Sequence, residues 1–125
     1  MSFLSNIFGA KQERQQLAPL YRSVVEVARA PLWYRQGEVP DTVDGRFDMV
    51  AAILALVLLR LEAEGERARS ESVWLTECFI DDMEGSVREF GTGDLMVGKR
   101  VGQLVGALGG RLTAFRDALD QKNGS

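Results

Sequence analysis

An uninterrupted apolar run, Met49 to Leu59, constrains the fold of this 125-residue chain more than any other feature. Eleven helical residues rise only about 16 Å, whereas the hydrocarbon core of a bilayer is roughly 30 Å thick. The run is therefore too short to span a membrane. Asp41, Thr42 and Asp44 precede it as alternative N-caps, and charged residues follow it. A helix that is apolar on every side is buried among others, so the run predicts the central helix of a bundle.

Three other segments carry apolar side chains at helical spacing, namely residues 12–29, 71–90 and 95–119. No segment alternates with a period of two, so we expect no strand. Between the first two helices, residues 30–43 contain two prolines and a glycine, and we expect an ordered loop without regular helix there. The sequence predicts an all-α fold: a single helical bundle of about four main helices with a long ordered loop between the first and second.

The ends of the chain have a different character from this bundle. We expect a short N-terminal amphipathic segment over residues 1–11, a helical domain over 12–120 and a disordered tail over 121–125. The N-terminal segment gathers four apolar side chains on one face, a candidate for peripheral membrane contact, although an extra turn packed on the domain explains them equally well. No secretory signal is visible, so we expect a cytoplasmic protein with candidate peripheral contact at the inner membrane. The four side chains are Phe3, Leu4, Ile7 and Phe8.

The composition argues against catalysis. The chain has no histidine, which removes the commonest general base and the commonest metal ligand, and its one cysteine, Cys78, cannot form an internal disulfide. An acidic cluster in the third predicted helix lacks the histidines that helical di-iron sites use, so we expect it to face solvent or a partner. We expect no catalytic residue, no cofactor, no metal and no enzymatic activity. The cluster consists of Glu77, Asp81, Asp82 and Glu84.

Charge is distributed unevenly along the chain. Residues 62–94 contain ten acidic and three basic side chains, whereas residues 95–125 contain five basic and two acidic ones. The net charge is −3 and the isoelectric point about 5.0, so nucleic-acid binding is not expected. The acidic stretch supports an alternative function, a soluble adaptor or regulatory module that binds another protein through this face.

A partial phosphate-loop pattern, GxxxxGK, runs from Gly93 to Lys99. Arg100 occupies the position of the Ser or Thr that binds magnesium, and the segment before the pattern is predicted to be a helix where a phosphate loop needs a strand. A turn between two helices is the better interpretation.

Four glycines recur at intervals of four in the last predicted helix: Gly98, Gly102, Gly106 and Gly110. Each costs up to about 1 kcal/mol of helix stability relative to alanine, and close backbone approach is the usual compensation. By helical geometry they lie roughly 130° from the apolar stripe of the same helix. Either a neighbouring helix of the same domain fills this groove, the simpler interpretation, or a helix of a client protein does.

Four stretches carry a resemblance to a known family: residues 31–34 (PLWY), 39–47 (VPDTVDGRF), 81–83 (DDM) and 91–100 (GTGDLMVGKR). In this order and spacing they resemble the ubiquinol-cytochrome c chaperone family, over residues 17–119, and its compact bacterial members in particular. The resemblance implies an all-helical, non-enzymatic assembly factor for respiratory complex III that engages the membrane subunit cytochrome b.

The candidate partner-binding residues combine these motifs with the glycine series. Our first hypothesis is a chaperone that binds a hydrophobic client, cytochrome b, through the glycine-lined side of the last helix and adjoining apolar loop residues. The second is the adaptor described above. The oligomeric state stays open. The candidates are Trp33, Asp41, Arg46, Asp81, Asp82, Asp94, Gly98, Lys99, Arg100, Gly102 and Gly106.

Overall fold

The structure, a computed structural model, describes residues 18–89 and 93–123 of the chain. These residues form only helices and connections, which confirms the predicted all-α fold. The predicted N-terminal amphipathic segment, with Phe3, Leu4, Ile7 and Phe8, lies outside the described residues. The elements are a helix over residues 18–28, α2 (Pro31–Arg35), α3 (Val43–Ala63), the short 3₁₀ helix η1 (Gly65–Ala68), α4 (Arg69–Glu89) and α5 (Asp94–Asn123).

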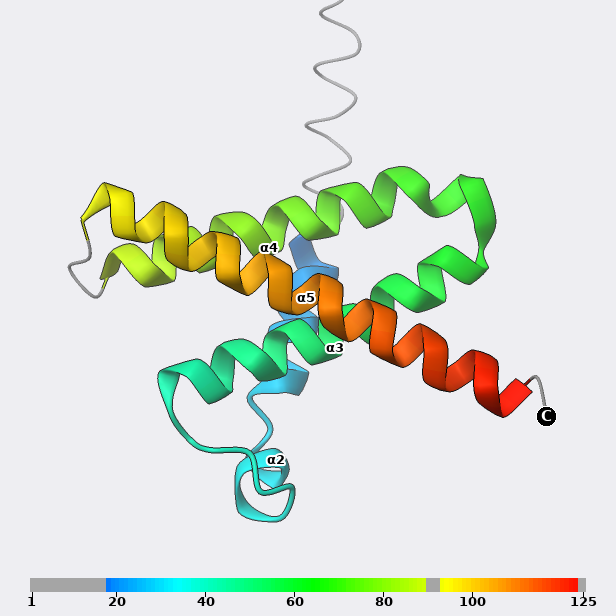
Figure 1. Cartoon of the computed structure of the whole chain (residues 1–125), viewed down its shortest axis with the longest axis horizontal. Coiled ribbons are helices and arrows are strands. Elements are labelled where there is room, and N and C mark those ends of the chain that lie inside the picture. Colours follow the sequence, from blue (N-terminus) through cyan, green and yellow to red (C-terminus); the bar gives the residue numbers. More distant parts are fainter. Residues whose placement is uncertain (1–17, 90–92, 124–125) are drawn as a thin grey trace, which may run out of the picture.

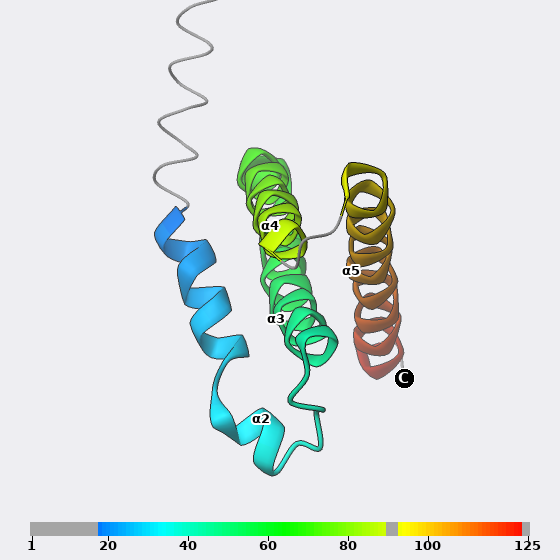
Figure 2. The ribbon, with the colours of Figure 1, turned by 90° about the vertical axis from the view of Figure 1, so that its left-hand side faces the viewer.

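The helices pack in three layers (Figure 2). α3 and α4 lie in the middle, the 18–28 helix covers one side, and α5 covers the other and crosses both central helices (Figure 1). Leu54 of α3 and Leu75 and Phe79 of α4 are completely buried at the centre. α5 is therefore an outer helix with one face against the core, and no described element lies above its other face.

The apolar run is the central helix that the sequence predicts, with one exception. Val50, Ala51, Leu54, Ala55 and Leu58 of α3 are buried. Leu56, however, is 51% exposed. The prediction that this helix is buried on every side was therefore wrong at this position. With helices on only two sides of the middle layer, one edge of α3 stays uncovered.

Three boundaries differ from the sequence-based expectation. Residues 30–43 were predicted to lack regular helix, but Pro31–Arg35 form α2, because a proline at the first helical position loses no intrahelical hydrogen bond. Secondly, α4 begins at Arg69, directly after η1. Thirdly, α5 continues to Asn123, so residues 121–123, predicted as disordered tail, are helical.

The connection between α3 and α4 is tight. Gly65 begins η1 with a φ of 85°, a left-handed conformation that glycine adopts without steric cost. Across the described ranges, 18–89 and 93–123, no helix combines the length and the apolar character needed to cross a bilayer.

Candidate functional site

The predicted loop is held against the end of the 18–28 helix. The indole Nε1–H of Trp33 donates a hydrogen bond to the Val27 carbonyl at 2.7 Å, and the Tyr34 hydroxyl donates one to the Ala28 carbonyl at 2.9 Å. Both acceptors are carbonyls of the last turn, and the Val27 carbonyl also accepts a bond from the Ala30 backbone N–H at 3.2 Å. Burial raises the pKa of Tyr34. Trp33, a candidate partner-binding residue, therefore caps a helix of its own domain.

The PDTVDGRF motif forms the start of α3. Thr42 is its N-cap, and its hydroxyl accepts a hydrogen bond from the Gly45 backbone N–H at 3.0 Å. Gly45 is buried, and a Cβ at this position would lie 1.9 Å from the Pro40 carbonyl oxygen. Asp41 and Arg46, both candidates, form an exposed ion pair with each other at 2.9 Å. These contacts give the motif a structural role, because they bring the loop back onto the start of α3.

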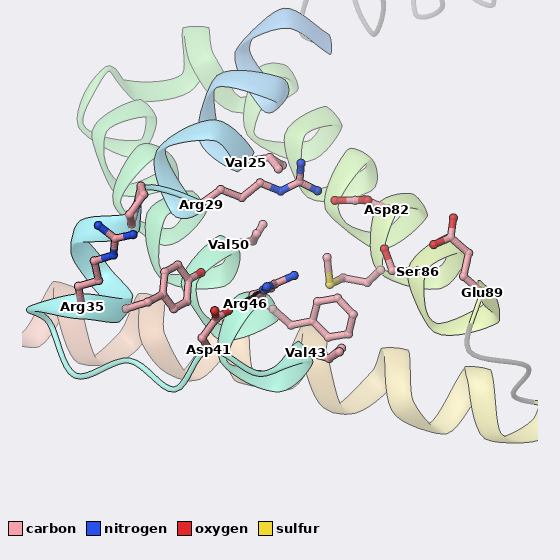
Figure 3. A pocket seen from close by; sticks show the side chains of 14 residues that line it. Val25, Arg29, Arg35, Asp41, Val43, Arg46, Val50, Asp82, Ser86 and Glu89 are labelled. Carbon is pink, nitrogen blue, oxygen red and sulfur yellow. Dashed lines mark hydrogen bonds and ion pairs between the residues drawn. The ribbon is translucent and has the colours of Figure 1, made fainter.

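A cleft of about 860 Å³ opens above this motif (Figure 3). It is bounded by the 18–28 helix, α2, the start of α3 and the second half of α4, and we call it the motif cleft because three of the four family-like stretches line it. It brings together Asp41, Arg46 and Asp82 of the predicted site. Its lining residues are Val25, Arg29, Pro31, Tyr34, Arg35, Asp41, Val43, Arg46, Phe47, Val50, Asp82, Met83, Ser86 and Glu89.

Asp82 of α4 accepts a hydrogen bond from the 18–28 helix. The hydroxyl of Tyr21, which is 8% exposed, donates a hydrogen bond to its Oδ2 at 2.6 Å. Burial, followed by the bond to this carboxylate, raises the pKa of Tyr21 far above its usual value, so the phenol stays protonated. Elsewhere on the acidic cluster, Asp81 is exposed and Glu84 pairs with Arg88 at 3.0 Å. The predicted acidic face is therefore only partly available to a partner.

The GxxxxGK stretch forms the first turns of α5, not a phosphate-binding loop. The Val97 backbone N–H donates to the Gly93 carbonyl at 2.9 Å, and residues 94–100 are helical. Arg100 makes an ion pair with Asp44 of α3, which joins two of the family-like stretches. Lys99 is exposed, and the side chain of Asp94 lies outside what the structure describes.

The glycines of α5 face outward. A Cβ built on Gly98, Gly102, Gly106 or Gly110 would meet nothing within 4 Å, so the interpretation that a neighbouring helix of the same domain fills the groove was wrong for the described residues. Leu95, 93% exposed, lies on the same side of the helix by its spacing of three and seven residues from Gly98 and Gly102. The exposed Lys99 lies on this side as well, three and seven residues before Gly102 and Gly106. We call this surface the α5 glycine face; it consists of Leu95, Gly98, Lys99, Gly102, Gly106, Gly109 and Gly110.

A second cleft, of about 710 Å³, lies at the opposite end of α3 and was not predicted. Leu58, Leu61, Val73 and Leu112 contribute its apolar lining. Val73, an apolar residue that is half exposed on α4, is a sequence signal for it. Within residues 18–89 and 93–123, no group of Cys, Asp and Glu side chains is arranged to hold a metal ion.

Comparisons with known proteins agree on one family. The family model described as ubiquinol-cytochrome C chaperone matches residues 35–125. The crystal structure of the Cbp3 homolog from Brucella abortus is similar over 97% of this chain and 67% of that chain, with a TM-score of 0.76 and 30% sequence identity. No match was found among curated proteins. Since the family model covers well over half of the chain, and the solved structure agrees with it in fold, the chain belongs to the ubiquinol-cytochrome C chaperone family.

Proposed function

We propose that the chain is an assembly chaperone for ubiquinol-cytochrome c reductase, respiratory complex III, and that its client is cytochrome b. The observation that carries the proposal is the family match over residues 35–125, because the family takes its name from this complex. The similarity to a bacterial Cbp3 homolog supports it. Members of this family are chaperones and not enzymes, which fits a chain without histidine.

The α5 glycine face is the surface that we propose for the client. A membrane helix that is not yet in the bilayer exposes apolar surface to water, and covering it contributes roughly 25 cal/mol per Å². Glycines allow a second helix to bring its backbone close, as in packed membrane helices. The face is open along its length, and Leu95 and Met96, both exposed, add apolar side chains at one end.

The assignment to complex III is tested by deletion of the gene in a bacterium that makes this complex. We expect less assembled cytochrome b, measured by its haem absorbance in isolated membranes, and recovery when the gene is restored. Affinity purification of the tagged chain in mild detergent should recover cytochrome b. A normal level of active complex in the deletion strain would contradict the assignment.

The client surface is tested by Gly102→Leu and Gly106→Leu. A Cβ at either position meets no described atom within 4 Å, so the variants should fold and yet hold a client helix away from α5. We expect less cytochrome b to co-purify with them. Gly85→Leu is the matched control, because Gly85 is also an exposed helical glycine with no neighbour within 4 Å, but lies on α4. Unchanged recovery with folded variants would exclude this face.

The adaptor alternative receives less support. Of the acidic cluster that suggested it, Asp82 accepts a hydrogen bond from Tyr21, and Glu84 pairs with Arg88. A partner bound through the remaining acidic side chains would be released by salt, since exposed charges are screened over about 8 to 10 Å at ordinary ionic strength. Retention of the captured protein at high salt therefore favours the α5 glycine face, whose contact with an apolar client does not depend on ion pairs.

A further inference from the structure

The motif cleft differs in chemistry from the α5 glycine face. Its floor is apolar: Val50 and Met83 are buried, and Val25 and Phe47 are partly buried beside them. Its volume of about 860 Å³ is within the range of clefts that bind ligands in proteins. Its rim, in contrast, carries six charged side chains. An occupant therefore needs apolar groups to cover the floor and polar groups to meet the rim.

The protein itself uses only part of this charged rim. Arg46 pairs with Asp41, and Asp82 accepts the Tyr21 hydroxyl. The side chains of Arg29, Arg35 and Glu89 are exposed and make no hydrogen bond or ion pair with any described residue.

These three charges are placed asymmetrically. Figure 3 shows Arg35 and Glu89 at opposite ends of the cleft, with the Arg29 side chain between them, extended toward Asp82. The end formed by α2 is thus cationic, and the end formed by α4 is acidic.

We propose that the motif cleft binds an amphipathic helical segment of a soluble protein partner. Apolar side chains of this segment cover the floor, an acidic side chain meets Arg35 at one end, and a basic side chain meets Glu89 at the other. A uniformly apolar membrane segment fits poorly, because it would remove the rim charges from water without pairing them. An anionic lipid fits poorly as well, because it would meet the carboxylates of Glu89 and Asp82.

This site goes beyond the proposed function, because it is separate from the surface proposed for the client. No residue of α5 lines the motif cleft. In the layered fold, α5 lies on one side of the central helices and the 18–28 helix, which bounds the cleft, on the other (Figure 2). The chain can therefore hold two proteins at once, and the cleft can be tested without cytochrome b.

The test uses three fluorescent synthetic peptides of 18 residues with one apolar stripe in common. The first carries glutamates at one end and lysines at the other, the second glutamates at both ends, and the third lysines at both ends. Binding to the full chain is followed by fluorescence anisotropy. Since one exposed ion pair contributes a few-fold in affinity, we expect the dipolar peptide to bind about fivefold tighter than either of the others. Equal binding, tightest binding of the all-glutamate peptide, or no binding up to about 1 mM would overturn the proposal.

Charge reversal of the protein provides the second arm. Arg35→Glu should weaken the dipolar peptide about fivefold and tighten the all-lysine peptide, and Glu89→Lys should tighten the all-glutamate peptide. Arg22→Glu is the matched control for Arg35→Glu: it makes the same charge reversal at an exposed arginine that does not line the cleft. Circular dichroism verifies folding. Equal effects of Arg22→Glu and Arg35→Glu, or no change of preference with both Arg35→Glu and Glu89→Lys, would also overturn the proposal.

Discussion

Gly45 lies where the loop from α2 turns back onto α3, and the position has no space for a side chain. A Cβ there would lie 1.9 Å from the Pro40 carbonyl oxygen and 3.2 Å from the Thr42 hydroxyl, which caps the helix. The first neighbour is backbone, so it cannot rotate away as a flexible side chain could. The glycine of the DGRF motif is therefore explained by close approach of two backbone segments.

We expect Gly45→Ala to lower the free energy of unfolding by about 2 to 3 kcal/mol, because the loop or the first turn of α3 must move. Urea unfolding followed by circular dichroism measures this change. Gly85→Ala is the control. Its Cβ meets no neighbour, so the same substitution should raise stability by up to about 1 kcal/mol. Similar effects of both substitutions would show that Gly45 is not under steric constraint.

Tyr21 gives the molecule a specific response to high pH. Its pKa is raised in the folded chain, by burial first and then by its hydrogen bond to Asp82, whereas in the unfolded chain it is near 10. A raised folded-state pKa contributes stability that is complete below pH 10 and is lost as the pH rises above it. The free energy of unfolding should therefore fall above pH 10, by at most about 1.4 kcal/mol per pH unit for one proton.

Tyr21→Phe removes this proton, so its urea unfolding should depend less steeply on pH between 9 and 11.5. Near pH 8 the variant should be about 1 to 2 kcal/mol less stable, since Asp82 loses a donor. Some slope will remain, because burial also raises the pKa of Tyr34. Identical slopes in the two proteins would contradict a buried, hydrogen-bonded Tyr21.

At the scale of the elements, α5 is long but intrinsically weak. It spans Asp94–Asn123 and contains five glycines between residues 98 and 110. Its stability comes from the packed side, where Val97, Leu104 and Leu108 are buried against the other helices. On the glycine side, a Cβ built at any of these glycines would meet no described atom within 4 Å, and this asymmetry is what makes the face a candidate for binding.

Gly102→Leu and Gly106→Leu should each stabilise the isolated domain by up to about 1 kcal/mol, because leucine is a far better helix former and neither position has a neighbour. Thermal or urea unfolding checks this. We also expect these variants to bind less client, so they should raise the stability of the domain and lower its function. A lower stability in either variant would show that the glycine face packs against part of the same chain.

Among the described residues of the whole molecule, the core is apolar and contains no buried charged side chain. The ion pairs lie at the surface. Two of them, Arg100–Asp44 and Arg116–Glu62, join α5 to α3 near opposite ends of the shared interface. Exposed pairs of this kind contribute about 0 to 1 kcal/mol each. Hydrophobic packing, and not charge, therefore holds α5 in place.

Raising sodium chloride from 0.05 to 0.5 M should accordingly change the free energy of unfolding in urea by less than about 1 kcal/mol. Screening removes most of the attraction between exposed charges over this range, while the apolar core is unaffected. A loss of about 3 kcal/mol would mean that ion pairs, and not the buried side chains of α5, determine the stability of the fold.

The sequence by itself determined the number, type and approximate positions of the main helices, because apolar periodicity and capping residues act within a few neighbouring residues. It also determined the family, through the motifs that include residues 39–47 and 91–100. It missed α2 as a helix, because two prolines in the same short stretch outweighed the favourable position of Pro31 at the first turn.

Only the tertiary structure decided which candidates meet. Asp82 and Tyr21 are 61 residues apart, and Arg100 and Asp44 are 56 apart, so no local pattern could have paired them. The same holds for the motif cleft, which is assembled from four separate elements, and for the α5 glycine face. Periodicity located the glycines on one side of a helix, but whether another helix covers that side depends on how the layers stack, and α5 is the outermost layer.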